Sequence, residues 1–597
     1  VGLTHKSRDT AITLLVVPLL VQILDDDPAA QPMIKDSSDS MEATATEWTI
    51  KERAPAILAM LITDSEYLQK AAFDANVISK LSKMLKVSYD PVPDSANSQS
   101  WSPQGDDEAE AIGFKRSSRF SSPGQPPLLL HKIRVRESTL KAIAALVPFQ
   151  DEYRKVVVEQ GIIPYIVESM CSNPRKPTPK LGDRPEKEVN GSKDQGGPTG
   201  YGVNPVSVII AACGAVRALS RSVSILRTSL IDNGVAMPVF RLLQHPDIEV
   251  QIAATATVCN LVTDVSPMRE IITEAGVLKI LCEHAHSMNA KLRLNALWAL
   301  KHFVHAVGND MKRLCLEELG QGWLVQLISD DTEVTSDKAT GETAVDNMDV
   351  DVDMDRVEDH ARPPVADSFS HPGLSRPSGS LSKSMQQAES RLAALRDAEL
   401  NPARKARKDD IAVQEQGLDF IRNLIGGAGQ GGTSGPAEMI DFLFNTLGQD
   451  RVFQILTNKL RPRPVNPFSR RGTATIGETR IIPPQSEIIT AVGYILVHMA
   501  ASEPRHRQLI IAQTELLKLL VPQFNHPSIE VRLALCWLVT NLTWMDDASD
   551  GQACATRAHE LRKLGFFTKL EILEQEDPEL NVRERAKSAL WQMKKGY

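Results

Sequence analysis

The sequence predicts an all-α protein built by repetition of one helical unit. Three segments align without gaps at a spacing of 42 residues: Val208–Ser220, Val250–Val262 and Leu292–Val304. Their apolar residues coincide, and the intervals between them place most of these side chains on one stripe of a helix. A small residue recurs at Ala212, Ala254 and Ala296, where it would let neighbouring helices approach closely. A fixed period of this length is typical of a solenoid, in which each repeat packs on its neighbours.

A fourth copy of the unit lies far downstream. The segment His245–Leu261 aligns with His526–Leu542, and nine of the seventeen positions are identical. In each copy a His-Pro pair ends one helix, and the residue after it, Asp247 or Ser528, helps the next helix to begin. A last copy occupies Asp577–Met593. The repeat is therefore expected to continue into the C-terminal part of the chain.

A shorter unit that contains a glycine separates the long helices. It reads VVVEQGIIPYIV at 156–167, SLIDNGVAMPVF at 229–240 and IITEAGVLKILC at 271–282. Its glycines, Gly161, Gly234 and Gly276, fit a helix C-cap, with the next helix beginning directly after. Each period is thus a short helix, a middle helix and a long helix. Three helices in about 40–47 residues predict the armadillo fold, a right-handed superhelical solenoid, rather than HEAT repeats or an ordinary helical bundle.

Four polar stretches interrupt the expected array. Their composition cannot bury enough apolar surface to offset the entropy of ordering, so we expect disordered insertions. They occupy 88–127, 171–204, 329–410 (acidic, rich in Pro and Ser) and 460–484 (rich in Pro and Arg). Armadillo repeats are then expected at 1–87, 128–170, 205–328 (three repeats), 411–459 and 485–597. The remaining length holds about nine or ten repeats in one elongated domain.

The composition argues against several classes of protein. The 597 residues include 67 Lys and Arg against 75 Asp and Glu, a net charge of −8, so the chain as a whole is not built to coat nucleic acid. Seven scattered cysteines do not suggest a disulfide framework, and the expected compartment is reducing. The most apolar run, Ala11–Leu24, is shorter than a membrane span. Because it contains Pro18 and Gln22, it predicts a buried helix rather than a signal peptide.

Two glycine-rich or acidic segments resemble ligand-binding loops without meeting their requirements. The segment 346–360 lacks the Gly and Glu that a calcium loop needs at its sixth and twelfth positions. The run 426–435 contains G-x-G-x-x-G, but it follows a predicted helix instead of a strand and has no Lys-Ser/Thr pair. We expect a solvated linker and an inter-helix loop, respectively.

No catalytic or metal-binding motif stands out. One cysteine and four histidines are considered as zinc ligands: Cys282, His284, His286, His302 and His305. No second cysteine pair with zinc spacing accompanies them, and on a helix His284 would point away from Cys282 and His286. We therefore expect no metal, no cofactor and no catalytic residues. The basic run Arg404–Lys408 is a candidate nuclear localisation signal.

The candidate binding site is the face of the third helix of each repeat, which lines the concave surface of an armadillo solenoid. Residues four apart share that face. Such pairs are Gly214/Ala218, Ala256/Asn260, Trp298/His302, Asp419/Asn423 and Trp537/Asn541. An Asn amide both donates and accepts, so it would bind the backbone of an extended peptide, with a Trp as the wall of a side-chain pocket. The expected site residues are Asn260, Trp298, His302, Asn423, Trp537, Asn541 and Trp544. The alternative is that the Asn side chains cap neighbouring turns and the Trp rings belong to the core.

Two known families share parts of this pattern. Importin α holds basic peptides with W-x-x-x-N, which only Trp537/Asn541 completes here, with Trp298/His302 as a variant. A closer resemblance is to the armadillo repeat-containing protein 8 family, whose fungal counterpart is a vacuolar import and degradation protein. It rests on VRALSRSVSILRTSL at Val216–Leu230, VCNLV at 258–262, LDFIRNLI at 418–425 and CWLVTNLTW at 536–544.

The second resemblance implies a non-catalytic scaffold subunit of a GID/CTLH-type E3 ubiquitin ligase. Such a subunit holds the tail of a substrate receptor in its concave groove and links it to the RING and LisH–CTLH subunits, for proteasome-dependent degradation. The expected partners are proteins, with no nucleic acid, membrane or small-molecule substrate, and the expected location is cytoplasmic and nuclear. Two alternatives stay open: a nuclear transport adaptor like importin α, with an acidic groove, and a β-catenin-like scaffold, with a strongly basic groove.

Overall fold

A computed structural model describes residues 15–24, 39–92, 126–177, 200–225, 229–263, 272–305, 307–329, 402–426, 435–464 and 481–595. Residues 1–328 and 413–597 form one compact unit, and 329–412 form another. Most of the described residues of the first unit are helical. The predicted all-α armadillo fold is confirmed. Among the described helices, none combines the length and the apolar composition that crossing a bilayer requires.

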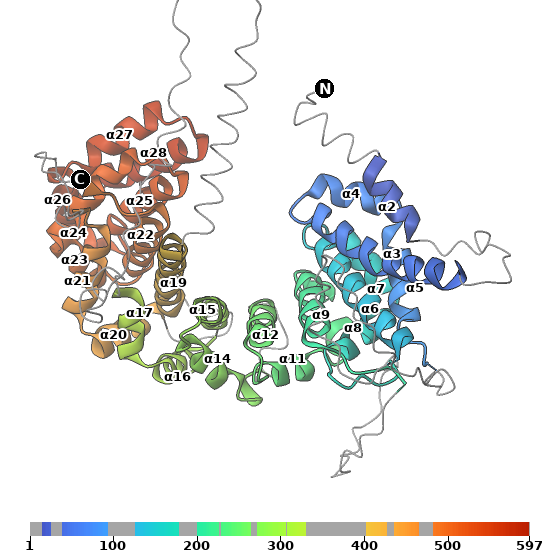
Figure 1. Ribbon diagram of the computed structural model, residues 1–597. Helices are drawn as coiled ribbons and strands as arrows, with labels where there is room; N and C mark the ends of the chain where they lie inside the picture. The colour runs from blue at the N-terminus through green and yellow to red at the C-terminus, as the bar shows by residue number, and fades with distance from the viewer. Residues whose placement is uncertain are drawn as a thin grey trace, which may run out of the picture. The chain divides into compact units, whose positions relative to one another are not determined.

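The N-terminal half of the unit consists of short and long helices in alternation (Figure 1). The short and middle helices are α2 (Val17–Ile23), α4 (Glu66–Asp74), α5 (Val77–Val87), α7 (Asp151–Glu159), α8 (Ile163–Ser169), α10 (Val223–Ile225), α11 (Ala236–Leu242), α14 (Val277–Ala285), α16 (Asn309–Leu319) and α17 (Gln321–Ser329). The long helices are α3 (Asp39–Ile62), α6 (Pro127–Leu146), α9 (Val206–Leu219), α12 (Ile248–Leu261) and α15 (Ala290–Val304). Each long helix packs against the next, from α3 through α6, α9 and α12 to α15.

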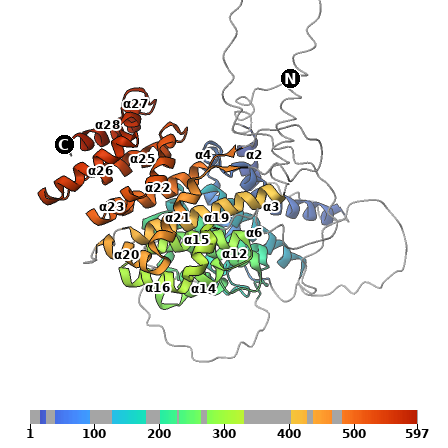
Figure 2. The ribbon, with the colours of Figure 1, turned by 90° about the vertical axis from the view of Figure 1, so that its left-hand side faces the viewer.

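The C-terminal half repeats this arrangement. Its long helices are α19 (Pro402–Ile425), α22 (Ser486–Ala500), α25 (Ile529–Leu542) and α28 (Leu580–Lys595). The others are α20 (Pro436–Leu447), α21 (Gln449–Leu460), α23 (Pro504–Ala512), α24 (Thr514–Leu520), α26 (Gly551–Lys563), α27 (Phe566–Glu576) and the 3₁₀ turns η7 (Val521–Asn525) and η8 (Ala548–Asp550). Figure 2 shows α22, α25 and α28 in succession, and each packs on the next.

The predicted 42-residue period is confirmed by the long helices. The three aligned segments form α9, α12 and α15, and the recurring small residues Ala212, Ala254 and Ala296 are completely buried. Their lack of bulk allows the close helix approach that the sequence indicated. The predicted glycine caps are also confirmed: Gly161 and Gly276 have φ of +64° and +69°, a left-handed conformation that favours glycine.

The His-Pro turns use the histidine in a way that the sequence did not indicate. The ring nitrogen Nδ1 of His245 accepts from the backbone N–H of Asp247, and His526 does the same for Ser528, both at 3.0 Å. Asp247 caps α12 as expected, by accepting from the Glu249 N–H at 2.8 Å. Ser528 makes no such cap on α25, because its hydroxyl donates to the Glu530 carboxylate instead. The histidine therefore orders both turns whichever residue follows the proline.

Most of the predicted insertions lie outside the described residues. At the end of 329–410, helix α19 already begins at Pro402, inside the stretch expected to be disordered. The two ends of 460–484 form a short antiparallel pair, β1 (Arg463–Pro464) and β2 (Ile481–Ile482), which closes the base of that loop. This pair is the exception to the predicted all-helical composition among the described residues.

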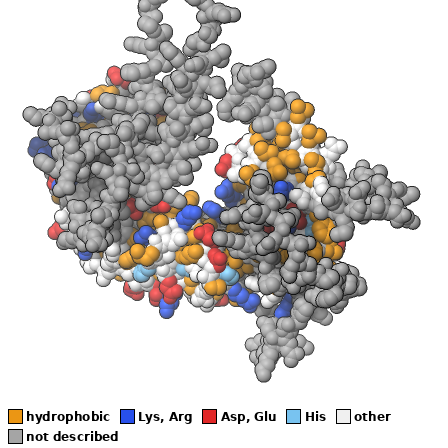
Figure 3. Space-filling view, viewed as in Figure 1, with side chains coloured by type: hydrophobic (Ala, Val, Ile, Leu, Met, Phe, Trp, Pro, Cys, Tyr) orange, Lys and Arg blue, Asp and Glu red, His pale blue; other side chains and the backbone are white. Residues whose placement is uncertain are grey.

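Helix α2 is only half buried, in contrast to the buried helix expected for Ala11–Leu24, of which residues 11–14 lie outside the described part. Val17 and Val21 face α3 and α4, whereas Leu15 and Leu19 are 62% and 55% exposed. Met60 on α3 is 81% exposed as well. Figure 3 shows apolar side chains gathered over α2–α4. An apolar surface of this kind is typical of a contact with another protein.

The close approach of α22 and α25 generates a test of the packing. A Cβ added at Gly493 would lie 3.3 Å from the Cβ of Ala534, so Gly493→Val should overpack this contact and lower the free energy of unfolding by about 1–3 kcal/mol. At Gly214 on α9 the nearest atom to an added Cβ is 3.6 Å away, so Gly214→Ala should leave stability equal or higher. Urea unfolding measures both; equal destabilisation would contradict the assigned packing.

Candidate functional site

Three asparagines at equivalent positions of long helices make the same hydrogen bond to the preceding long helix. The pairs are Asn260 Nδ2 with Arg217 O, Asn423 Nδ2 with Lys301 O and Asn541 Nδ2 with Val497 O, at 2.8, 2.8 and 3.0 Å. Each acceptor carbonyl belongs to the last turn of its helix, where that of Val497 also accepts from the Ala501 N–H and that of Arg217 from the Ser220 hydroxyl. We call these three residues the asparagine ladder. It joins α9 to α12, α15 to α19 and α22 to α25.

The asparagine ladder thus has a structural role, the alternative that the sequence left open. This role uses one donor of each amide. The side-chain oxygen and the second N–H take part in none of the hydrogen bonds found among the described residues, and all three side chains are half-buried. An Asn amide has two donors and an acceptor with two lone pairs. Each rung therefore retains the capacity to bind a peptide backbone.

The Trp298/His302 pair on α15 is bonded within itself. Trp298 Nε1 donates to His302 Nε2 at 2.9 Å, and the ring remains 39% exposed. Lys301 lies with its ammonium nitrogen 5.4 Å from the centre of the Trp298 ring, and the same nitrogen pairs with Asp419 Oδ2 at 2.9 Å. Asp419 comes from α19, so this corner joins the helices on either side of the long insertion.

A sixth pair, Tyr494/His498 on α22, escaped the sequence analysis. Asn541 bonds to Val497 in the same way that Asn260 bonds to Arg217, so the helices α22 and α9 are in the same register. His498, the residue after Val497, therefore occupies the position that asparagine has in other long helices. Tyr494, four residues earlier, occupies the position of the tryptophans. The signal was an aromatic residue and a histidine four apart, as in Trp298/His302. It was missed because α22 follows a Pro-rich loop instead of the His-Pro turn used for the alignment.

Positive charge surrounds Tyr494 and His498. The guanidinium carbon of Arg422 lies 4.7 Å from the centre of the Tyr494 ring. Burial, and after it the positive charges of Arg422, His305 and Lys312, lower the pKa of His498 from 6.5 to about 4. Lys312 is fully buried and donates to the carbonyl of Gly426 at 2.7 Å, which ties down the end of α19.

Trp537 on α25 completes the row of aromatic residues. Its ring is half-buried, and the guanidinium carbon of Arg585 on α28 lies 3.6 Å from the ring centre. This is close enough for a stacked cation–π contact. Asn541 lies one turn further along the same helix. We call Trp298, Tyr494 and Trp537, together with the asparagine ladder, the third-helix surface.

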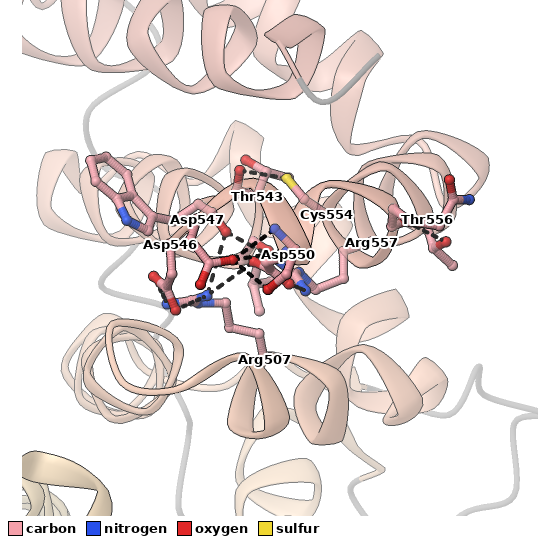
Figure 4. A network of polar contacts seen from close by, with 12 residues as sticks. Arg507, Thr543, Asp546, Asp547, Asp550, Cys554, Thr556 and Arg557 are labelled. Carbon is pink, nitrogen blue, oxygen red and sulfur yellow. Dashed lines mark hydrogen bonds and ion pairs between the residues drawn. The ribbon is translucent and has the colours of Figure 1, made fainter.

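Trp544 lies beyond the end of α25, and two buried arginines, Arg507 and Arg557 (labelled in Figure 4), fix the position of its backbone. Its carbonyl oxygen accepts from Arg557 Nη2 at 2.9 Å and from Arg507 Nη1 at 3.4 Å, while its side chain is 51% exposed. The exposed indole therefore belongs to a loop whose backbone is hydrogen-bonded by buried arginines.

Two carboxylates neutralise these arginines. Asp550 binds Arg557 through both oxygens, at 2.9 and 2.8 Å, and Asp546 binds Arg507 at 2.9 and 3.1 Å. The hydrogen bonds from Arg557 hold the pKa of Asp550 below its ordinary value. Bidentate pairs of this kind fix the orientation of both partners. The network makes the loop that follows Asn541 a rigid part of the surface.

The residues considered for zinc have other partners. His284 bonds to the Thr255 hydroxyl at 3.0 Å, and His286 Nε2 lies 2.7 Å from the carbonyl oxygen of Leu319. Within the described ranges, no three His, Cys, Asp or Glu side chains are grouped so that they could hold a metal ion. The acidic segment 346–360 lies outside those ranges, as do residues 427–434 of the glycine run and the side chains of Arg404–Lys408.

Comparison with known proteins agrees with the armadillo fold. Residues 266–304 match the family described as Armadillo/beta-catenin-like repeat. GID complex subunit 5 of Schizosaccharomyces pombe is 24% identical over an alignment of 637 residues, which covers 99% of this chain and 59% of that protein. Armadillo repeat-containing protein 8 of Danio rerio is 38% identical over 137 residues, 23% of this chain and 20% of that protein. The Xenopus laevis protein of the same name is 30% identical over 202 residues, 34% of this chain and 24% of that protein.

The resemblance to armadillo repeat-containing protein 8 that the sequence analysis stated is confirmed by these alignments. The similarity to GID complex subunit 5 runs through the whole array, whereas the similarity to the vertebrate proteins is confined to part of it. The chain spans 59% of the length of that fission-yeast protein.

The depressed pKa of His498 predicts an acid-sensitive stability. The unfolded chain takes up a proton near pH 6.5 and the folded chain near pH 4, so acidification through this window favours unfolding, by on the order of 3 kcal/mol at its lower end. His498→Asn, which introduces the residue found on the asparagine ladder, should remove this dependence. Urea unfolding at several pH values measures it; an identical pH dependence in wild type and variant would contradict the assignment.

The arginine network predicts a large effect of one substitution. Arg557→Met removes both bonds to Asp550 and leaves this buried carboxylate with only the more distant Arg507, at 3.6 Å, which should cost about 3–5 kcal/mol of the free energy of unfolding. The neighbouring Thr556→Ala removes only an exposed bond to the Gln552 carbonyl and should change stability by about 0.5 kcal/mol or less. Thermal unfolding of the two variants compares them; equal midpoints would show that the network is dispensable.

Proposed function

We propose that this chain is a non-catalytic adaptor subunit of a GID/CTLH-type E3 ubiquitin ligase. The observation that carries the proposal is the similarity to GID complex subunit 5 over 99% of the chain. The resemblance to armadillo repeat-containing protein 8 in four separate segments adds to it. The relatives are armadillo proteins, and solenoids of this kind act by presenting extended surfaces to partners.

The third-helix surface is the proposed binding site for the terminal tail of a substrate receptor. Half-exposed aromatic rings alternate there with asparagine amides that retain free donors and acceptors. Aromatic residues beside backbone-binding amides are suited to an extended peptide, because the rings contact side chains while the amides satisfy the peptide backbone. Asn541, Trp537 and the rigidly held Trp544 form the proposed C-terminal part of this site.

The apolar surface over α2–α4 is the proposed contact with the rest of the ligase, the RING and LisH–CTLH subunits. An adaptor needs two separate surfaces, and this one carries exposed apolar side chains such as Leu19 and Met60. Exposed apolar patches of this kind are typical of protein–protein contacts. The mechanism is an increase in effective concentration: the adaptor holds receptor-bound substrate close to the ubiquitin donor. The proposed location is the cytoplasm and nucleus.

Substitutions in the C-terminal part of the third-helix surface test the receptor site. Trp537→Ala or Asn541→Ala should each weaken capture of the receptor by about 1–3 kcal/mol, or about 5–150-fold in affinity, because each removes an anchor. Affinity purification of the full chain from its own cells, followed by quantitative mass spectrometry, measures capture of the receptor and of the RING and LisH–CTLH proteins.

The control for this experiment is Ile572→Ala, which truncates a partly exposed apolar side chain on α27, outside the long helices. It should leave receptor capture unchanged. The two site variants should also retain the RING and LisH–CTLH proteins, since these bind elsewhere. Absence of those proteins from the wild-type purification would overturn the proposed ligase, and unchanged receptor capture by both folded site variants would overturn the proposed site.

A further inference from the structure

A cation accompanies every aromatic residue of the third-helix surface. Lys301 lies 5.4 Å from the centre of the Trp298 ring, Arg422 lies 4.7 Å from that of Tyr494, and Arg585 lies 3.6 Å from that of Trp537. The cation comes from the same helix in the first case, from the preceding long helix in the second and from the following one in the third. The association is therefore a property of the surface and not of one local sequence.

These cations change what the aromatic rings can bind. A ring face attracts a lysine or arginine of a ligand through its quadrupole, but here a residue of the protein already lies over the face. A basic ligand side chain would meet a positive charge at each ring. Beside Arg422, His305 and Lys312 also lie near His498, where their charges add to the effect of burial in lowering its pKa.

The acidic groups of this region do not neutralise all of these cations. Asp419 pairs with Lys301 at 2.9 Å and lies 3.8 Å from Arg422, so it is shared between two cations. Burial and then the nearby Asp419 raise the pKa of Glu415, Lys301 opposes them, and Glu487 adds a smaller effect in the raising direction. Arg585 belongs to none of the ion pairs found among the described residues, and its contact with Trp537 holds the guanidinium at the surface.

We infer that the third-helix surface binds an extended peptide segment with acidic side chains, one of whose carboxylates pairs with Arg585 while the peptide backbone bonds to the Asn541 amide. This inference rests on the proposed function of binding a receptor tail, and it specifies the chemistry of that tail. A guanidinium held by an aromatic ring is preorganised for a bidentate bond to a carboxylate.

The geometry also sets the spacing of the acidic residues. Neighbouring packed helices are about 8–10 Å apart, and an extended chain advances about 3.3 Å per residue. The step from one long helix to the next therefore corresponds to roughly three residues of peptide. An acidic residue at about every third position can therefore reach successive cations. Residues between them would place their backbone over the asparagine ladder.

Three fluorescein-labelled peptides test the inference with the full chain. Each consists of four copies of a tripeptide, Glu-Ser-Val, Gln-Ser-Val or Lys-Ser-Val, so that the probes differ only at every third position. Fluorescence anisotropy at low salt measures their affinities. The Glu probe should bind at least about tenfold more tightly than the Gln probe, and the Lys probe should bind most weakly.

Charge reversal at one position identifies the residue responsible. Arg585→Glu should abolish the preference for the Glu probe and improve binding of the Lys probe, whereas Lys587→Glu, two residues further along α28, should keep the wild-type order with at most a small general loss. Asn541→Ala should weaken the Glu and Gln probes by a similar factor, because it removes a contact with the backbone that both share.

The inference is overturned if the Gln or Lys probe binds as tightly as the Glu probe, if no probe binds, or if Arg585→Glu leaves the order unchanged. These outcomes are independent of the test of the proposed function. If the Lys probe binds most tightly while the ligase subunits still co-purify, only the inference that the ligand is acidic is overturned. Preference for the Glu probe without those subunits in the purification would overturn only the proposed ligase.

Discussion

The bond from an asparagine amide to the last turn of the preceding long helix is the contact on which the third-helix surface depends. Each such bond adds a donor to a carbonyl in the last turn of a long helix, and it does so across a repeat boundary. It fixes the rotation of each long helix relative to the one before. On α25 it consequently also fixes the place of Trp537, which lies one turn before Asn541.

This dual use explains how a half-buried polar residue can serve both stability and recognition. The amide donates one N–H to a carbonyl of the neighbouring helix, and its oxygen and remaining N–H stay available at the surface. At α15 and α22 histidine takes the place of asparagine, and the two histidines differ in environment. His302 accepts a bond from Trp298, whereas burial and the nearby charges of Arg422, His305 and Lys312 lower the pKa of His498. Equivalent positions of successive long helices therefore carry side chains of different chemistry along the solenoid.

The cations next to the aromatic rings distinguish this surface from one that holds basic peptides. The sequence left an importin-like adaptor open, and such an adaptor needs an acidic groove. In the structure, Arg422 and Arg585 lie against aromatic rings at the positions where a basic ligand would insert. The net charge of the chain, −8, describes the whole molecule and does not indicate which charges lie beside these rings.

The sequence by itself determined the repeat, because the 42-residue period, the capping glycines and the buried alanines are local patterns that packing requires in every copy. It also identified five of the six residues of the third-helix surface. Only the tertiary structure decided what they contact. It supplied Tyr494 and His498 through the bond from Asn541 to Val497, and it brought Arg585 of α28 onto Trp537 of α25. Such contacts join different repeats, and the spacing within one repeat carries no information about which side chain of the next will lie against it.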